Sequence, residues 1–235
     1  MTMRSVIDKL IMSVTPDSDR YPPLLREIPD RPKVLYVMNP VIDWGNSVPI
    51  AVAGTRNPTP NGIKLTRRIV RELVYEGYTP IVTGGARGID RIALRVFVSH
   101  GGDGVKVPPC IKLNDYIYDS TVEKISEHLC TGSWSVQMNG WLVERNRIIV
   151  GTAYALVIPE VRISNPHWRE YGVACCGTQH AVRYARQYGR EAIVIKPQDS
   201  PEDVREAYEV IVETGAVPVS TIDELITELR IVTRR

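Results

Sequence analysis

The sequence predicts an α/β fold, a doubly wound and mostly parallel sheet of the extended Rossmann-like kind, built as a single domain with an N-terminal lead-in. Three observations support this prediction. Short apolar segments alternate with amphipathic helical patterns along most of the chain. Glycine-rich turns follow several of these apolar segments. The chain has 235 residues, a length that suits one domain with modest additions.

The N-terminal part differs from the rest. Residues 1–47 are rich in proline, which predicts a partly irregular lead-in. Apolar residues within it, among them Leu25 and Ile28, need burial, so we expect the lead-in to pack on the core. Residues 48–235 are expected to form the Rossmann-like domain.

Strands are predicted where short apolar segments are bounded by turn residues, at 49–53, 79–82, 105–107, 155–159, 192–195 and 216–219. Helices are predicted where apolar residues recur at helical spacing, at 63–76, 89–100, 120–129, 142–150, 178–188, 201–213 and 223–230. Gly77 and Gly189 are the expected stops of two of these helices. The helix at 120–129 rests on a capping box, in which Glu123 follows Ser120 at the required spacing. Short apolar strands separated by helices are typical of a parallel sheet covered on both faces.

Composition and charge exclude several classes of protein. Lys and Arg total 29 and Asp and Glu total 27, so the formal net charge is only +2. Hydrophobic residues make up 43% and charged residues 24%, which excludes a disordered chain, a collagen-like chain and a strongly basic nucleic-acid coat. A polyanionic partner would therefore have to bind at a local patch.

Neither a membrane protein nor a metalloprotein is expected. No apolar run approaches the roughly 18 residues of a transmembrane helix, and charged residues interrupt the first segment where a signal peptide would be apolar. The cysteines, Cys110, Cys130, Cys175 and Cys176, lack zinc-ligand spacing, and the four histidines are scattered. We interpret the cysteines as reduced thiols of a cytoplasmic protein and expect no metal and no cofactor.

Three glycine-rich segments lie at predicted strand ends or helix starts, where open α/β sheets bind ligands. They are Gly54-Thr55-Arg56-Asn57, Gly84-Gly85-Ala86-Arg87-Gly88-Ile89-Asp90 and Gly177-Thr178. Glycine lets the backbone approach a ligand, helix N-termini offer N–H groups to an anion, and the arginines add positive charge. The three segments together predict a crevice that binds phosphate. For Asp90, which opens a helix, capping is the favoured role.

A second basic segment contains Arg145, Asn146 and Arg147. The two arginines diverge by about 200° on a helix, so at most one is expected to face the crevice. A solvated helix start is the alternative interpretation. The chain has no GxxxxGK[ST] motif and no GxGxxG after a strand, which argues against a P-loop ATPase and the usual NAD or FAD site.

These motifs resemble those of the DprA/Smf (DNA-processing protein A) family, within the LOG / lysine-decarboxylase-like Rossmann superfamily. VAGTRNPTPNG is similar to the family's G-[ST]-R-x-P-T-x-x-G turn, and VTGGARGID is similar to its S-G-x-A-x-G-I-D loop. ERNRIIVGTAYALVI resembles the R-N-R-I-I-x-G segment and the strand after it. The resemblance extends from Tyr21 to Leu229. Leu94 stands where the family usually has a histidine, and residues 161–173 replace a shorter glycine-rich link.

The resemblance implies a cytoplasmic homodimer that binds single-stranded DNA, resembles a recombination mediator and loads a RecA-type recombinase. The positions that match the family's DNA-binding crevice are Gly54, Thr55, Arg56, Gly84, Ala86, Gly88, Asp90, Arg145, Asn146, Arg147, Gly177 and Thr178. No catalytic residue is implied.

Two other functions remain open. One is a nucleotide-binding or sensing module that uses the same crevice without DNA. The other is a LOG-type nucleotide phosphoribohydrolase, with the signature P-G-G-x-G-T-x-x-E. The chain keeps Gly177 and Thr178 of that signature, but Ala181 stands at the glutamate position, so acid/base chemistry is disfavoured. Cys175 lies beside the same turn and is either a reactive thiol with a lowered pKa or a small buried residue.

Overall fold

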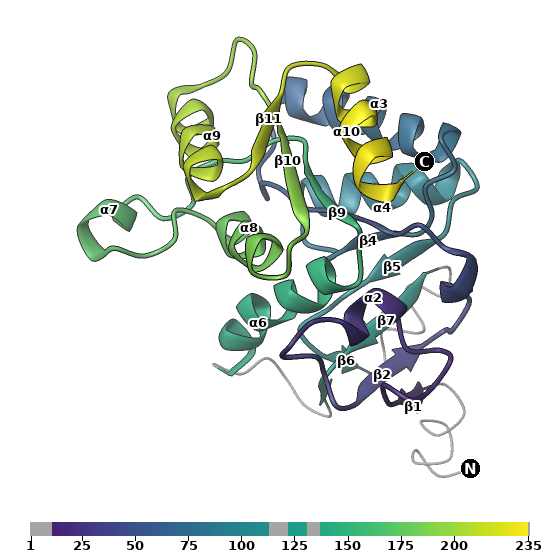
Figure 1. The fold of residues 1–235 in the computed structure, drawn as a ribbon. Helices are drawn as coiled ribbons and strands as arrows, with labels where there is room; N and C mark the ends of the chain where they lie inside the picture. The colour runs from purple at the N-terminus through teal and green to yellow at the C-terminus, as the bar shows by residue number, and fades with distance from the viewer. Residues whose placement is uncertain (1–10, 113–121, 131–136, 235) are drawn as a thin grey trace.

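The computed structural model describes residues 11–112, 122–130 and 137–234. Within these residues, nine strands form one sheet in the order β1-β2-β7-β5-β4-β3-β9-β10-β11 (Figure 1). The parallel strands are β3 (Ile50–Val52), β4 (Ile81–Thr83), β5 (Gly104–Lys106), β7 (Glu123–Ser126), β9 (Ala155–Ile158), β10 (Glu191–Ile195) and β11 (Val217–Val219). The predicted doubly wound, mostly parallel α/β fold is confirmed.

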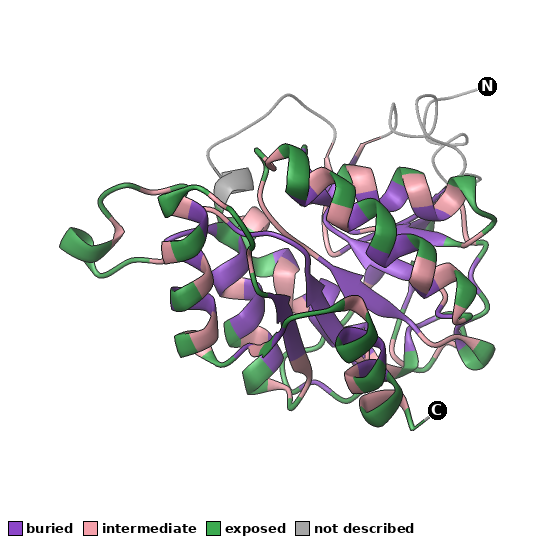
Figure 2. Ribbon diagram, turned by 90° about the horizontal axis from the view of Figure 1, so that it is seen from above, coloured by how far each residue is buried: buried purple, intermediate pink, exposed green. Residues whose placement is uncertain are grey.

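Helices cover both faces of this sheet (Figures 1 and 2). One face carries α3 (Pro60–Tyr75), α4 (Ile89–Ser99) and α10 (Ile222–Thr233), and the other carries α6 (Gln137–Gly151), α8 (Gly177–Gln187) and α9 (Glu202–Thr214). Strand residues alternate between the two layers: Ile50 and Val52 pack with the first set, whereas Ala51 packs with the second. Both faces are buried, which explains why β3 (IAV) and β9 (ALVI) are uniformly apolar.

The helix ends follow the sequence signals in several places. Thr59 caps α3 by accepting a hydrogen bond from the Gly62 N–H at 2.9 Å, and Pro60 occupies the first helical position. Ile69 and Leu73 of the same helix are fully buried. Each expected helix except the one at 120–129 is present, with ends that shift by up to five residues in α6 and by less elsewhere.

The prediction of a helix at 120–129 is wrong. Residues 120 and 121 lie outside the described part, and Glu123–Ser126 form β7, which is buried along its whole length. β7 pairs in parallel with β5 and antiparallel with β2 (Leu35–Met38), so both of its edges are hydrogen-bonded. The Glu123 carboxylate accepts hydrogen bonds from the N–H groups of Val41 and Ile42, each at 2.9 Å, rather than closing a capping box. Tertiary pairing has overridden the local helical signal.

The lead-in contributes strands as well as loops. β1 (Ile11–Val14) and β2 form an antiparallel pair at one end of the sheet, and β2 joins them to β7. Leu25, in the short helix α2 (Pro23–Arg26), and Ile28 are buried in the same core as α6. The division of the chain after residue 47 stays a prediction.

The interpretation of all four cysteines as reduced is wrong for Cys110 and Cys130, which form a disulfide. Cys110 precedes β6 (Ile111–Lys112) and Cys130 ends β8 (Leu129–Cys130), two short parallel strands that form a small sheet, and the two Cα atoms are 5.8 Å apart. A separation of 20 residues gave no spacing signal for this pairing. No helix in the described part of the chain is long and apolar enough to cross a bilayer.

Burial of Glu123 makes the stability of the fold depend on pH. Burial raises the pKa of the Glu123 carboxyl to about 7, although the hydrogen bonds from Ile42 and Val41 oppose the shift. A carboxyl whose pKa is higher in the folded state than in the unfolded state favours folding at low pH. That contribution is lost as the pH rises through 4.5 towards 7.

Glu123→Gln cannot ionise and still offers an acceptor to Val41 and Ile42. We expect its free energy of unfolding, relative to wild type, to rise by about 3 kcal/mol between pH 4.5 and pH 8. Urea unfolding at several pH values measures this difference. Glu209→Gln, on the exposed side of α9, is the control and should show no such rise. A constant difference for Glu123→Gln across this range would contradict the prediction.

Candidate functional site

The topological switch point of the sheet lies between β3 and β9. From β3 the chain proceeds to β4 and β5 on one side, whereas from β9 it proceeds to β10 and β11 on the other. Ligands of open α/β sheets bind at such a point, beyond the carboxyl ends of the strands. A cavity of about 540 Å³ is present there, formed by the loops after β3, β4 and β9 and by parts of α6 and α8. We call it the switch-point cavity.

Most of the predicted site residues meet at this cavity. Those that line it are Gly54, Thr55, Arg56, Asn57, Ala86, Arg87, Asp90, Arg145, Asn146, Gly177 and Thr178. Four do not line it: Gly84, Gly85, Gly88 and Arg147. The three glycines belong to the loop behind the wall, whereas Arg147 points elsewhere on α6.

Glu160, directly after β9, holds the turn that follows β3. Its carbonyl oxygen accepts a hydrogen bond from the Thr55 N–H at 3.0 Å. Its carboxylate accepts one from the Thr59 N–H at 2.8 Å and one from the Thr59 hydroxyl at 2.5 Å. Gly54 allows this approach, because a Cβ there would lie 2.6 Å from the Glu160 carbonyl oxygen. Glu160 was not predicted as a site residue. It follows β9 and Pro159, and an acidic residue just after a buried strand is a signal that could have indicated it.

The loop after β4 packs directly against this turn. The Ile89 N–H donates to the Thr55 carbonyl at 3.1 Å, and the Arg87 guanidinium donates to the Asn57 side-chain oxygen at 2.6 Å. Gly88 has a φ of +91°, and its Cα faces the backbone of Thr55 and Arg56. The two glycine-rich segments therefore form one continuous wall of the cavity.

Asp90 is a buried carboxylate within that wall. It accepts a hydrogen bond from the Ala86 N–H at 3.3 Å, which holds the loop at the start of α4. Burial raises the pKa of Asp90, whereas the nearby Arg145 charge lowers it. Asp90 is thus bonded to the loop before the helix and lies in the first turn of α4, whose N-cap residue, Gly88, has no side-chain cap.

Arg145 is the buried cation of the site, with 8% of its surface exposed. One terminal nitrogen donates to the carbonyl oxygens of Gly84 and Val107, and so joins α6 to the ends of β4 and β5. Burial lowers the pKa of Arg145, the Asp90 charge raises it, and the neighbouring Arg56 charge lowers it further. Its Nε is buried and has no hydrogen-bond partner among the described residues.

Arg147 faces the opposite side of α6. It forms an ion pair with Glu127, in the segment between β7 and β8. Arg145 therefore reaches the switch-point cavity and Arg147 does not, as the angle of about 200° between them on a helix predicts. Asn146, between them, donates a hydrogen bond to the Gly177 carbonyl at 3.4 Å and links α6 to the start of α8.

Two cysteines precede α8, and their acidities differ. Of the two alternatives for Cys175, the small buried residue agrees with the structure, because its hydrogen bond to Cys176 and its burial both raise its pKa. Cys176 is the N-cap residue, and the hydrogen bond from Cys175 lowers its pKa, as do the N–H groups of Gln179 and Thr178. Both thiols are free and buried.

The segment 161–173, whose role the sequence left open, supplies part of the cavity. Arg162, Ile163 and Ser164 line it, and the short helix α7 (Trp168–Tyr171) projects from the molecule beyond them (Figure 1). The Arg162 guanidinium pairs with Asp203 of α9 at 2.6 Å and donates to the Asn57 carbonyl at 3.1 Å. The hydrogen bond that Arg162 donates to Asp203 raises the pKa of Arg162. Sequence reasoning missed both Arg162 and Asp203.

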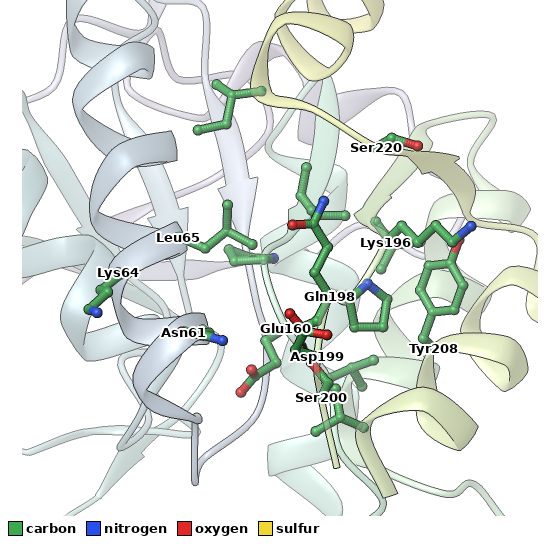
Figure 3. A pocket seen from close by; sticks show the side chains of 18 of the residues that line it. Asn61, Lys64, Leu65, Glu160, Lys196, Gln198, Asp199, Ser200, Tyr208 and Ser220 are labelled. Carbon is green, nitrogen blue, oxygen red and sulfur yellow. Dashed lines mark hydrogen bonds between the residues drawn. The ribbon is translucent and has the colours of Figure 1, made fainter. Parts of the chain in front are cut away.

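A second cavity, of about 470 Å³, lies beside the first along the same edge of the sheet. Figure 3 shows it with Asn61 and Glu160 on one side, Lys196 and Tyr208 on the other, and Gln198 between them. Lys64 points away from this centre. Lys64 and Lys196 lie on opposite sides of this second cavity, so these two cations do not converge on one anion. Within the described residues, no group of three side chains of His, Cys, Asp or Glu is placed to hold a metal ion.

Comparison with known sequences gives one family. Residues 12–230 match the family described as DNA recombination-mediator protein A. Protein Smf from Synechocystis sp. is 29% identical over 229 residues, which cover 92% of this chain and 53% of that protein. The chain thus spans about half the length of this curated relative.

Solved structures share the fold. DNA processing protein A from Helicobacter pylori, which was studied for its single-stranded DNA binding mode, aligns with a TM-score of 0.70 and 22% identity, over 93% of this chain and 95% of that one. DprA from Streptococcus pneumoniae aligns with a TM-score of 0.75 and 23% identity, over 96% of this chain and 76% of that one. The molybdenum cofactor carrier protein of Chlamydomonas reinhardtii is more distant, with a TM-score of 0.54 and 16% identity, over 81% of this chain and 100% of that one.

The contact between the two glycine-rich segments leads to a test with a matched control. Gly88 and Gly101 have similar positive φ values, +91° and +85°. A Cβ at position 88 would overlap the backbone of Thr55 and Arg56, whereas a Cβ at position 101 would meet nothing within 4 Å. Gly101→Ala should therefore lower the free energy of unfolding by about 1–2 kcal/mol, the cost of its left-handed backbone alone.

We expect Gly88→Ala to lower the free energy of unfolding clearly more than Gly101→Ala does, because the wall of the cavity must also move. Urea unfolding compares the two variants, and hydrogen exchange of the Ile89 amide reports on the wall itself. Equal losses of stability, with the Ile89 amide still protected, would show that the two segments do not depend on this contact.

Proposed function

Because the chain belongs to the DNA recombination-mediator protein A family, we propose that it is a DNA-processing protein that binds single-stranded DNA through the phosphate backbone at the switch-point cavity. The family relationship supports DNA as the class of partner. The cavity supplies the chemistry, because backbone N–H groups, a helix start and arginines meet there.

The observation that carries the proposal is the state of the two arginines. Arg145 is buried with its Nε unpaired, and the Arg56 side chain has no hydrogen bond or ion pair with any residue in the described ranges. The two charges repel, since Arg56 lowers the pKa of Arg145. A phosphate beside Arg56 would pair that charge and offset its repulsion of Arg145, which makes the site complementary to an anion.

The start of α8 adds a second source of attraction. Gly177 and Thr178 begin the helix and line the cavity, and Gly177 is exposed. No acidic side chain lies in that first turn. A phosphate there would meet the positive end of the helix dipole.

Two carboxylates limit the strength of binding. Asp90 and Asp203 also line the cavity, and Asp203 already pairs with Arg162. Arg87 is bonded to Asn57 but keeps its charge. Together with a net charge of only +2, this arrangement favours moderate affinity that depends strongly on salt.

A nucleotide-binding or sensing module is the second candidate. A cavity of about 540 Å³ lies within the size range of small-ligand sites, so a single nucleotide would fit without a longer strand. Hydrolysis of the nucleotide is disfavoured, because the buried Ala181 lines the cavity where a LOG-type enzyme has its glutamate. A homodimer and a RecA-type recombinase partner belong to the same proposal and rest on the family relationship.

Arg56→Ala should weaken the binding of a single-stranded oligonucleotide about tenfold at low salt, because one charge-assisted contact to phosphate is lost. It should also reduce the slope of log affinity against log salt concentration by about 0.7. Fluorescence anisotropy at several salt concentrations measures both quantities. Arg95→Ala removes an exposed arginine from α4, outside the cavity, and should change neither. Equal affinity of wild type and Arg56→Ala would refute binding at this cavity.

The two candidate functions differ in thermal-shift experiments. If DNA is the ligand, oligonucleotides of about 20–50 nucleotides should stabilise the protein more than any mononucleotide at equal phosphate concentration. A larger shift with one mononucleotide would instead favour the sensing module. Release of adenine from adenosine monophosphate would favour the hydrolase.

A further inference from the structure

We propose that Cys175 and Cys176 form a vicinal dithiol that hydroperoxides oxidise to a disulfide between these two neighbouring residues. The proposal goes beyond DNA binding and does not depend on it. It rests on the placement of the two sulfur atoms at the wall of the switch-point cavity.

The two thiols face each other. Their sulfur atoms are 3.6 Å apart, and the Cys175 thiol donates a hydrogen bond to the Cys176 sulfur. The other cysteines of the chain, Cys110 and Cys130, are bonded to each other. Each thiol of the pair therefore has one available partner within the molecule, its neighbour in sequence.

The backbone around the pair is held on both sides. The Cys175 N–H donates to the Gln179 side-chain oxygen at 2.8 Å. The Cys175 carbonyl accepts from the N–H groups of Ser164 and Asn165, at 2.9 and 3.1 Å. These contacts fix the backbone of the pair with the two sulfur atoms close together. The Cα atoms of adjacent residues lie about 3.8 Å apart across a trans peptide, below the usual range for a disulfide, so closure to a separation of about 2.05 Å requires the turn to shift as well as the side chains.

The two sulfur atoms have different roles. Cys176 lines the cavity and so is the one that a small reagent meets first, whereas Cys175 lies behind it, fully buried. The hydrogen bond from Cys175 and the N–H groups at the start of α8 lower the pKa of Cys176 and raise its thiolate fraction. Cys176 is therefore the attacking group, and Cys175 keeps its proton until the second step.

The reaction balances with a hydroperoxide as the oxidant. The Cys176 thiolate attacks one peroxide oxygen and the O–O bond breaks, which leaves a sulfenic acid on Cys176. The other oxygen departs, takes up the proton lost by Cys176, and becomes water or an alcohol. The Cys175 sulfur then attacks the sulfenic sulfur, the S–O bond breaks, and the Cys175 proton leaves with the hydroxyl as water. Two thiols have lost two electrons, and the peroxide has gained them.

Peptide mapping tests the proposal on the full chain. Trypsin would release Cys175 and Cys176 together on residues 170–183, whereas Cys110 and Cys130 fall on residues 107–112 and 125–145. The protein is treated with hydrogen peroxide, alkylated with iodoacetamide in denaturant and digested. We expect the 170–183 peptide to lose two hydrogen atoms and to escape alkylation, and we expect dithiothreitol to restore both thiols.

Two variants separate this reaction from its alternatives. Cys175→Ser lacks the second thiol, so its Cys176 should proceed to the sulfinic acid under the same treatment. A variant with both Cys110→Ser and Cys130→Ser should oxidise the 170–183 peptide as wild type does, which excludes exchange with the other pair. The proposal fails if both thiols of wild type are alkylated after peroxide. It also fails if Cys176 of wild type becomes sulfinic acid as readily as in Cys175→Ser.

A second measurement needs no variant. Phenylarsine oxide forms a stable ring with two adjacent thiols and releases water, and one thiol alone holds it weakly. We expect wild-type protein to take up one phenylarsine group on the 170–183 peptide and then to resist oxidation there. A protein that takes up none on that peptide would contradict the facing arrangement of the sulfur atoms.

Discussion

The buried guanidinium of Arg145 ties together the parts of the molecule that form the switch-point cavity. From α6 it reaches the carbonyl oxygens of Gly84 and Val107, which end two neighbouring strands, and it lies beside the Asp90 carboxylate. A charge taken out of water is costly unless hydrogen bonds and an opposite charge compensate it. The strand ends, the loop before α4 and the helix α6 must therefore keep one mutual position, because any other leaves a charge uncompensated. The glycine at position 84 follows from the same constraint, since a Cβ there would lie 2.5 Å from the guanidinium.

The sequence predicted the fold where its signals were long or came in pairs. The apolar stripe of α3 and Gly77 after its end predicted the same helix, although its first turn, with Thr59 as the cap and Pro60 at its start, lies before the predicted start at residue 63. The segment with Glu123 was predicted as a helix from a capping-box pattern, which is short. Its structure is decided by pairing with β2 and β5, and the sequence around Glu123 does not show that pairing. The disulfide between Cys110 and Cys130 was missed for the same reason, since only the register of two short strands brings the residues together. A short sequence pattern reflects only interactions between residues close in the chain. It predicted α3, where such interactions decide the structure, and failed for β7 and the disulfide, where contacts between distant residues decide it.

The candidate site divides in a similar way. Glycines and arginines after strands predicted the cavity wall. Glycine is the residue that allows close approach of the backbone and arginine supplies positive charge, so both can be recognised in a sequence. The residues that hold the wall were not predicted: Glu160 acts through contacts with Thr55 and Thr59, and Arg162 through Asp203. Each of these contacts joins segments at least 40 residues apart. A residue that supports the wall by contacts with distant residues belongs to no recognisable sequence motif. Its role can be identified only once the structure shows its partners.

The position of β2 in the sheet has a consequence for synthesis. Tyr36 of β2 pairs with Ser126 of β7, so the partner strand lies about 90 residues later in the chain. A ribosome adds about 5–20 residues per second, so β2 emerges about 5–18 s before its neighbour. During that interval β2 can pair with β1 along one edge, while the backbone groups of its other edge lack β7 and the Leu35 and Val37 side chains, which the folded protein buries, lack the elements that cover them later. The growing chain therefore presents an unpaired strand edge for several seconds, which is the kind of edge that can pair with another chain.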